Sequence, residues 1–141
     1  MNAGARERLF PAALERLDEV AELVAVAAGE AGVPAHRGQQ LALAVEEAFT
    51  NVCRHAYGGG GGDVLVRAGV DGEAFVVELS DWGPAFDPLS RPEPDTRAAL
   101  ADRTPGGLGI LLIRRLMDAV EYERSTDANV LRMKVRLAAN P

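Results

Sequence analysis

The stretch that decides the fold is residues 41–57, LALAVEEAFTNVCRHAY. Its apolar residues recur at steps of three and four, which is the spacing of one buried face of an α-helix. Those residues are Leu41, Val45, Ala48, Phe49 and Val52. Glu47 and Asn51 lie four residues apart and off the centre of this face. A helix would therefore stack their side chains nearly one above the other, with His55 a turn further on.

Two interpretations of these polar residues stand side by side. A carboxylate and a carboxamide beside an apolar seam are costly to bury unless they have a purpose or partners. A base at Glu47, one turn from an oxygen ligand for a hard cation at Asn51, is such a purpose. The alternative is a helix whose Glu and Asn simply face water. The stretch alone does not decide between the two.

Length and composition narrow the class of protein. At 141 residues the chain is expected to form one domain, residues 1–141, with a single core. Its 48% hydrophobic and 26% charged residues are ordinary for a soluble globular protein. No apolar run reaches the roughly 18 residues of a membrane span, and residues 1–10 lack the apolar core of a signal peptide. The sequence therefore predicts a cytoplasmic protein without membrane contact.

Charge and rare residues exclude several chemistries. A net charge of −6 argues against broad or direct nucleic-acid binding, which needs a basic face. Cys53 is the only cysteine, so an internal disulfide and a cysteine-based zinc site are both excluded. Lys134 is the only lysine, and because it follows no glycine run, a Walker A phosphate loop is excluded as well.

The first half of the chain predicts a short strand and two helices. Residues 6–10 are expected to form the strand, and a helix is expected to begin at Pro11 and to end at Gly32 and Pro34. The second helix is expected over residues 35–55. The five glycines at 58–62 are interpreted as a flexible link, since no helix follows them. The predicted apolar stripe of the first helix is Leu14, Leu17, Val20, Ala21, Val24 and Ala27.

The second half predicts a sheet. Two strand-like runs, 64–70 and 75–79, are joined by Asp71-Gly72, a strong hairpin signal. A long loop with a short helix at 96–101 is expected next, then a helix over 110–118 and two more strands beginning at 120 and near 129. The sum is an α+β fold: a two-layer α/β sandwich with three main helices on one face of a mixed, mostly antiparallel sheet.

Three polar clusters stand at the ends of these elements. The first is Glu47, Asn51 and His55, and the second is the run 81–83, Asp-Trp-Gly. The third is the run 107–109, Gly-Leu-Gly, at a helix N-terminus, where free N–H groups and the helix dipole favour an anion. Each of the last two is explained about as well by an ordinary turn. A carboxylate placed after a buried strand can, however, accept a hydrogen bond from an exocyclic amine.

In this order the three clusters resemble those of the anti-sigma-factor serine/threonine kinases of the RsbW type. These kinases belong with the ATP domains of gyrase, heat-shock-90, histidine kinases and MutL. The resemblance covers about residues 10–137 and implies a Bergerat-type ATP-binding fold with ATP and Mg²⁺ as cofactors. It is carried by Glu47-Ala48-Phe49-Thr50-Asn51 with His55-Ala56-Tyr57, by Asp81-Trp82-Gly83-Pro84-Ala85-Phe86-Asp87-Pro88, and by Gly106-Gly107-Leu108-Gly109-Ile110 running into Leu116-Met117-Asp118.

The resemblance implies a role for each site residue. Asn51 would coordinate Mg²⁺, and Glu47 would be the general base that takes the proton from a substrate hydroxyl. Asp81 would hydrogen-bond the adenine amino group, with Gly83 leaving room for the ring. A second positive charge at the γ-phosphate is assigned to Arg103, with Arg54 as the runner-up. The remaining ATP-binding residues would be His55, Gly107, Leu108 and Gly109.

Two positions depart from the family pattern. Ala85 replaces the second glycine of the usual Asp-x-Gly-x-Gly box, which is expected to tighten that loop. Ala128-Asn129 stands where the family often has Gly-Thr, whose threonine supports the adenine-binding aspartate. The sequence leaves open whether Asn129 takes the place of that threonine.

Three functional readings follow from the resemblance. As an enzyme, the protein would phosphorylate a serine or threonine on an anti-anti-sigma partner of the STAS type. As a binding module, it would sequester a sigma factor, and family members of the anti-sigma kind do both. The third reading is a non-catalytic, ATP-dependent switch that regulates another partner. The resemblance also implies a homodimer.

Overall fold

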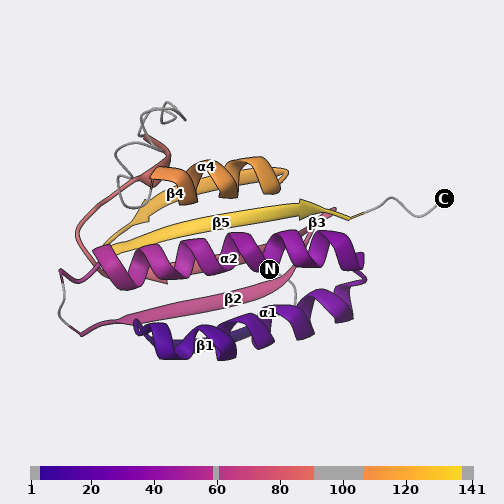
Figure 1. The fold of residues 1–141 in the computed structure, drawn as a ribbon, viewed down its shortest axis with the longest axis horizontal. Coiled ribbons are helices and arrows are strands. Elements are labelled where there is room, and N and C mark those ends of the chain that lie inside the picture. The colour runs from indigo at the N-terminus through magenta and orange to yellow at the C-terminus, as the bar shows by residue number, and fades with distance from the viewer. Residues whose placement is uncertain (1–3, 59–60, 91–106, 138–141) are drawn as a thin grey trace.

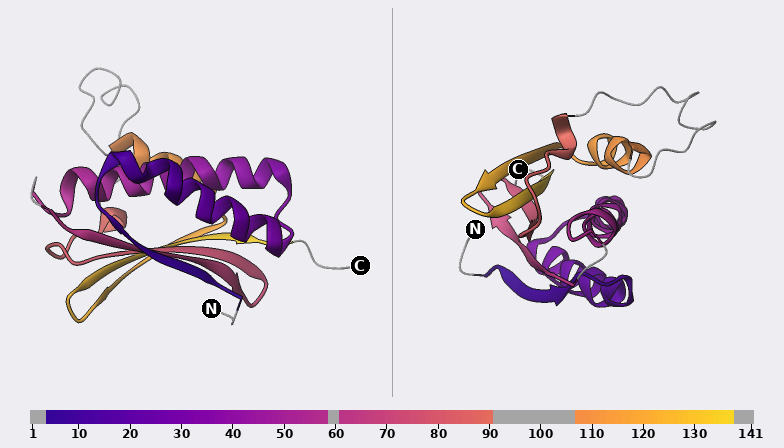
Figure 2. Two further views of the ribbon diagram at one scale, coloured as in Figure 1. Left: turned by 90° about the horizontal axis from the view of Figure 1, so that it is seen from below. Right: turned by 90° about the vertical axis from the view of Figure 1, so that its left-hand side faces the viewer.

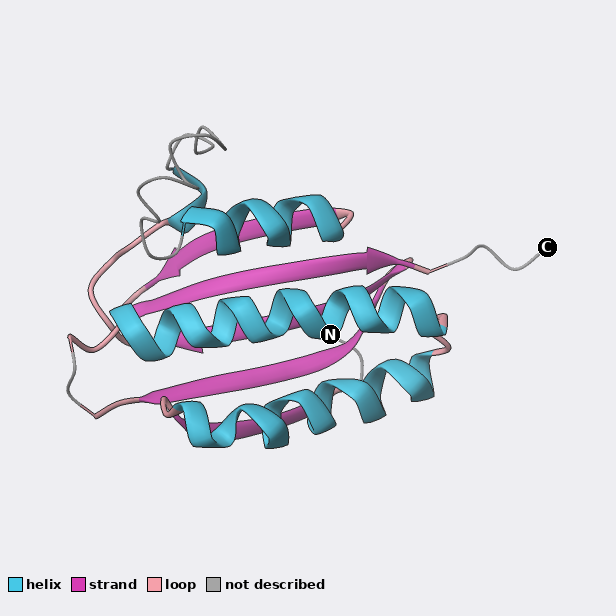
Figure 3. Cartoon of the chain, viewed as in Figure 1, coloured by secondary structure: helices cyan, strands magenta, loops and turns pink. Residues whose placement is uncertain are grey.

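The computed structural model describes residues 4–58, 61–90 and 107–137. Figures 1 and 3 show the helices and strands in this part of the chain. The strands are β1 (Arg6–Pro11), β2 (Asp63–Asp71), β3 (Ala74–Asp81), β4 (Ala119–Ser125) and β5 (Ala128–Arg136). The helices are α1 (Leu17–Ala31), α2 (Ala35–His55) and α4 (Gly107–Leu116), with short 3₁₀ helices η1 (Leu14–Arg16) and η2 (Pro88–Ser90). The short helix expected at 96–101 lies outside the described residues.

The five described strands form one sheet in the order β1-β2-β3-β5-β4. Every pairing in it is antiparallel, so the expectation of a mixed sheet was wrong in this respect. The reason lies in one connection. The crossover from β3 through α4 makes β4 run parallel to β3, but β5 turns back and inserts itself between them. The predicted hairpin at Asp71-Gly72 is confirmed, with Gly72 at a φ of +63°.

The helices cover one face of the sheet, which confirms the predicted two-layer architecture (Figure 2). Side chains from the two layers meet in a single core. On α2 the buried face is the one that the spacing of apolar residues predicts. Among the described helices, none has both the length and the apolar character needed to cross a membrane. The largest fully buried side chains include Phe10, Phe49, Phe75, Leu41, Ile113 and Met133.

The first helix begins later than the sequence predicts. Pro11 ends strand β1 opposite Asp63, and α1 begins only at Leu17, after η1. The pairing with β2 continues past the proline, because the N–H of Ala12 donates to the carbonyl of Gly62 at 2.8 Å. Leu14 therefore precedes α1 and is exposed. Within α1, Ala21 of the predicted stripe is also exposed, whereas Val20, Val24, Ala27 and Ala28 are buried.

The opposite face of the sheet carries a row of alternating charges, which we call the charge ladder: Glu7, Arg67, Glu78, Arg132 and Glu123. It runs across all five described strands. The closest pairs are Arg67 Nε to Glu7 Oε2 and Arg132 NH2 to Glu123 Oε2, both 2.9 Å, and Arg132 Nε to Glu78 Oε2, 3.0 Å. Glu78 lies between two arginines and is the least exposed of these side chains. In the described part of the chain, a row of paired charges thus crosses this face of the sheet.

Candidate functional site

A cavity of about 370 Å³ lies between the C-terminal half of α2, the sheet and the loop that follows β3. This volume is within the range of small-molecule sites. Its lining is mostly apolar with a few convergent polar groups, which is also typical of such sites. Among the described residues the polar lining comes from Asn51, His55, Asp81, Tyr122 and Asn129, and the apolar lining includes Ala48, Val52, Leu79, Pro84, Ala85, Phe86, Ile110 and Leu131.

The first predicted cluster lies along one edge of α2. Asn51 is half-buried and lines the cavity, and His55 lines it from an exposed position near the helix end. Glu47 is half-buried one turn before Asn51 and is not part of the lining. The stacking predicted from the four-residue spacing therefore extends the polar edge beyond the cavity, toward α4.

The third predicted cluster meets the first at this edge. Gly107 begins α4, and Gly109 packs so closely on α2 that a Cβ added to it would lie 2.8 Å from Glu47 Oε2 and 3.7 Å from Asn51 Nδ2. Only glycine leaves this space open beside both side chains. The first turn of α4, with its free N–H groups, thus lies next to the carboxylate of Glu47 and the carboxamide of Asn51.

The second predicted cluster brings Asp81 into the lining of the same cavity. Asp81, the last residue of β3, is only 8% exposed. Its Oδ1 accepts hydrogen bonds from the N–H of Gly83 and from Nδ2 of Asn129, both at 3.0 Å. Within the described part of the chain both hydrogen bonds to this carboxylate fall on Oδ1, which leaves Oδ2 available to a ligand. A buried carboxylate with one occupied oxygen is suited to accept a hydrogen bond from an amine.

Asn129 contacts Asp81 directly, a contact that the sequence left open. The two residues are opposite each other in the β3–β5 register, and Asn129 is 7% exposed. Its Nδ2 also donates to the carbonyls of Gly83 (3.3 Å) and Pro84 (3.0 Å). Its Oδ1 accepts from the hydroxyl of Tyr122 (2.6 Å) and from the N–H of Phe86 (3.2 Å).

Tyr122 was not among the residues predicted for the site. The sequence places it only as an alternating residue of β4, and its contact depends on the register with β5, in which it is opposite Leu131 and diagonal to Asn129. Arg124, also on β4, donates from NH1 to the carbonyl of Gly83 at 2.9 Å. The β4–β5 hairpin therefore holds the loop after β3 in place.

Position 83 requires a glycine because of a close packing contact that the sequence did not predict. A Cβ on Gly83 would lie 2.2 Å from the carbonyl oxygen of Ala56, so the loop after β3 packs against the end of α2. Tyr57 strengthens the same contact: its hydroxyl accepts from the N–H of Trp82 at 3.0 Å and donates to the carbonyl of Asp63. Burial raises the pKa of this phenol above its ordinary value.

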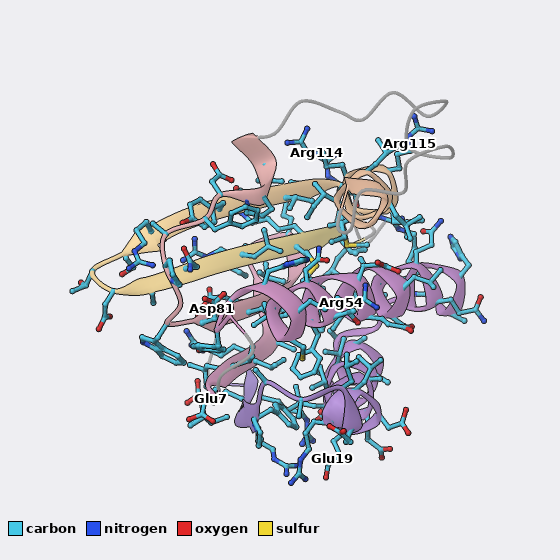
Figure 4. All side chains as sticks on the ribbon, turned by 60° about the vertical axis from the view of Figure 1, so that its left-hand side comes forward. Glu7, Glu19, Arg54, Asp81, Arg114 and Arg115 are labelled. Carbon is cyan, nitrogen blue, oxygen red and sulfur yellow. The ribbon has the colours of Figure 1, made fainter. Side chains whose placement is uncertain are left out.

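Figure 4 labels Arg54 on α2 and Arg114 and Arg115 on α4. Arg103, the first choice for a charge at the γ-phosphate, lies outside the described residues. Arg54, the runner-up, is exposed on α2 and forms no ion pair with another described side chain. On α4, Arg114 donates to the carbonyl of Leu89, whereas Arg115 is exposed. Within the described part of the chain, Arg54 and Arg115 thus have no ion-pair partner.

The described residues contain no cluster of three or more His, Cys, Asp or Glu side chains that could hold a metal ion by themselves. Asn51 provides a single carboxamide oxygen at the edge of the cavity. A cation here would need most of its ligands from a bound molecule and water. Mg²⁺ is commonly held in this way, by one or two protein groups together with phosphates.

The chain is similar to known proteins. Residues 10–135 match the family model described as the histidine kinase-like ATPase domain. The chain is 36% identical over 103 residues to a serine-protein kinase RsbW of Bacillus pumilus, covering 68% of this chain and 64% of the relative. It is 30% identical over 138 residues to the RsbW of Bacillus subtilis, covering 94% of this chain and 86% of the relative. The match to Bacillus pumilus RsbW thus spans slightly less than two thirds of that relative's length.

A solved structure has a similar fold. The histidine kinase AdeS of Acinetobacter baumannii superimposes with a TM-score of 0.51, at 13% sequence identity, over 95% of this chain and 68% of that chain. At this identity the likeness concerns the fold alone, and it places the described helices and sheet in a known α+β arrangement.

Proposed function

The chain belongs to the histidine kinase-like ATPase family, and on this premise we propose that it is a serine/threonine protein kinase. It binds ATP in the cavity beneath α2 and transfers the γ-phosphoryl group to a hydroxyl of a partner protein. One observation carries the proposal. Asp81 and Asn51 line the same cavity of about 370 Å³, and Gly109 packs beside Asn51 and Glu47.

In this proposal adenine occupies the part of the cavity next to Asp81. The free oxygen of Asp81 accepts a hydrogen bond from the exocyclic amine, while apolar side chains such as Leu79 and Ile110 contact the ring. The ribose and phosphates then extend toward α2 and the N-terminus of α4. There, backbone N–H groups of Gly107 and Gly109 face the phosphates without a side chain in the way.

Mg²⁺ fits the phosphate end. Asn51 offers a carboxamide oxygen as a ligand, and the missing side chain of Gly109 leaves open the space beside the Nδ2 of this carboxamide and beside Glu47 Oε2. When bound, the ion would neutralise charge on the phosphate oxygens and help to orient the γ-phosphoryl group. Phosphoryl transfer depends mostly on positioning and on charge stabilisation, so this small set of groups is sufficient.

Glu47 acts as the general base. Its carboxylate accepts the proton of the substrate serine or threonine hydroxyl as that oxygen bonds to the γ-phosphorus, and the bond from the γ-phosphorus to the bridging oxygen breaks, so that ADP leaves. Because Glu47 lies outside the cavity lining but beside Asn51, it is positioned for a hydroxyl that enters from the partner rather than for the nucleotide itself. Arg54 or Arg103 supplies the second positive charge at the γ-phosphate.

The partner is proposed from the relatives. Similarity to serine-protein kinases of the RsbW type supports a STAS-type anti-anti-sigma protein as the phosphate acceptor, with sequestration of a sigma factor as a second activity. We place the reaction in the cytoplasm and expect the kinase to act as a homodimer. A non-catalytic, ATP-dependent switch is the alternative outcome of the experiment below.

The test uses the single tryptophan. Trp82 follows Asp81 directly and is 43% exposed, so its emission should change when Mg-ATP binds. Glu47→Gln should keep ATP affinity, measured by calorimetry, and should lower phosphate transfer to the partner by about 10²–10⁴-fold. Glu46→Gln, the exposed neighbour on the same helix, is the matched control and should transfer normally. No binding by either method refutes the nucleotide site, and normal transfer by Glu47→Gln removes Glu47 as the base.

A further inference from the structure

The carboxamide of Asn129 is held in one orientation by the groups around it. Five hydrogen bonds surround it: two donors, from Tyr122 and Phe86, meet Oδ1, and three acceptors, on Asp81, Gly83 and Pro84, meet Nδ2. If the amide turned over, donors would face donors and acceptors would face acceptors. The environment therefore fixes which side of the amide meets Asp81.

This arrangement leaves Asn129 without a hydrogen bond to offer a ligand. Both Nδ2 hydrogens are used by described groups, and Oδ1 already accepts two hydrogen bonds. The hydroxyl of Tyr122 likewise donates its one hydrogen to Asn129. What these residues leave available to a ligand in the cavity is acceptor capacity, above all Oδ2 of Asp81.

We infer that Tyr122 and Asn129 form a positioning pair that fixes the carboxylate of Asp81, so that the cavity selects a base whose edge donates a hydrogen bond. The inference rests on the proposed function and adds the residues that determine its base selectivity. Neither residue is a catalytic residue, because each acts through Asp81. The hydrogen bond from Tyr122 strengthens the donation from Asn129 to Asp81, since linked hydrogen bonds polarise one another.

The proposed selectivity predicts a difference in affinity between two nucleotides. ATP carries the 6-amino group, and purine riboside 5′-triphosphate has a hydrogen in its place, with the same ring, ribose and phosphates. A hydrogen bond to a charged acceptor in a desolvated site gives about a ten- to hundred-fold difference in affinity. The unmodified protein should therefore bind ATP at least about ten-fold more tightly than purine riboside 5′-triphosphate, both with Mg²⁺.

The variants separate positioning from simple support of the loop. Asn129→Leu removes the amide, and Tyr122→Phe removes only the hydroxyl while its ring still lines the cavity. The ratio of the two affinities should fall to near one in Asn129→Leu and by about three-fold in Tyr122→Phe. Tyr57→Phe removes a hydroxyl that also contacts the loop after β3, at Trp82, but not Asn129, and it should keep the ratio of the unmodified protein.

The measurement is calorimetric titration of each full-length variant with both nucleotides. A ratio that falls in Asn129→Leu and Tyr122→Phe but not in Tyr57→Phe supports the inference. An equal loss of affinity for both nucleotides overturns it, because support of the loop alone would act on both. A ratio near one in the unmodified protein also overturns it, while leaving ATP binding intact. Failure of the unmodified protein to bind either nucleotide refutes the proposed function itself. If Asn129→Leu does not fold, Tyr122→Phe decides.

Discussion

Gly109 on α4 lies against the carboxylate of Glu47 on α2, so closely that a methyl group at position 109 would come within 2.8 Å of Glu47 Oε2. The obstructing atom is the end of a flexible side chain and not backbone. The carboxylate can therefore move aside at a small cost to the fold, but it then leaves the position next to Asn51 from which we propose that it acts as a base.

Gly109→Ala should separate stability from activity. The free energy of unfolding, measured by urea titration, should change by less than about 1 kcal/mol, because alanine favours a helix and offsets the crowding. Phosphate transfer should fall by about ten-fold or more, since a misplaced base loses much of its effect. Gly38→Ala, in α2 with open space around it, is the control and should be stabilised by about 0.5–1 kcal/mol with normal transfer. A Gly109→Ala protein with full activity would contradict the role of Glu47.

Gly83→Ala should have the opposite profile. The added methyl group would meet the backbone carbonyl of Ala56 at 2.2 Å, and backbone at the end of α2 cannot move aside without displacing the loop after β3. We expect a loss of about 1–3 kcal/mol in the free energy of unfolding, typical of overpacking. ATP affinity should also fall, because Gly83 donates to Asp81 Oδ1.

Thermal and urea unfolding of Gly83→Ala and Gly109→Ala, measured side by side, check this difference. The expected order of stability places Gly109→Ala close to the unmodified protein and Gly83→Ala clearly below it. Equal stability of the two variants would mean that the contact between the loop and α2 yields more easily than its backbone geometry indicates.

Much of the fold follows from local patterns in the sequence. The buried face of α2 is set by the spacing of Leu41, Val45 and Phe49, and the β2–β3 hairpin by Asp71-Gly72, where the backbone needs a positive φ. These signals act over a few residues. The start of α1 was mispredicted because Pro11 is tolerated equally at a strand end and in a first helical turn, and pairing with β2 decided between the two.

The interactions that complete the site were beyond such patterns. Asp81 and Asn129 are 48 residues apart and meet only because β5 pairs with β3 in one register. Tyr122 reaches Asn129 along a diagonal of the next strand pair. The position of β5 between β3 and β4 is set by tertiary structure. Neither the alternation of residues 131–137 nor the motif around Asp81 predicts it.

The charge ladder should contribute a measurable but salt-sensitive coupling. Glu78 is 13% exposed and lies 3.0 Å from Arg132 Nε, so water screens this pair less than a fully exposed one. A double-mutant cycle of Glu78→Ala and Arg132→Ala should give a coupling of about 0.5–1 kcal/mol in the free energy of unfolding, smaller in 1 M salt, where the screening length is only about 3 Å.

The exposed pair Arg16 and Glu19, whose closest N–O distance is also 3.0 Å, serves as the comparison for the ladder. Because both of its side chains are more exposed, its coupling should be smaller, about 0–0.5 kcal/mol. Equal couplings for the two pairs would show that burial of Glu78 does not strengthen the ladder.

Asp118 makes stability depend on pH at the end of the sheet away from the cavity. Its Oδ2 accepts from the N–H of Arg136 at 2.6 Å and lies 2.9 Å from NH2 of Arg37, and the hydrogen bond from Arg136, followed by the charge of Arg37, lowers the pKa of this carboxyl. A pKa lowered by folding stabilises the native state above the unfolded pKa, about 3.9, and this contribution disappears as the pH falls through the folded pKa.

Asp118→Asn should therefore lower the free energy of unfolding at pH 7 by less than about 1 kcal/mol, because the side chain is half exposed. Urea titrations should give the same difference in free energy of unfolding between the variant and the unmodified protein at pH 7 and at pH 5. Below about pH 4 this difference should become smaller, because the native carboxylate of the unmodified protein becomes protonated. Asp127→Asn, in the exposed turn between β4 and β5, is the control for the loss of one negative charge. If the loss of stability in Asp118→Asn stays constant down to pH 3, the pKa of Asp118 is not lowered by folding. If the loss grows as the pH falls, folding raises this pKa instead.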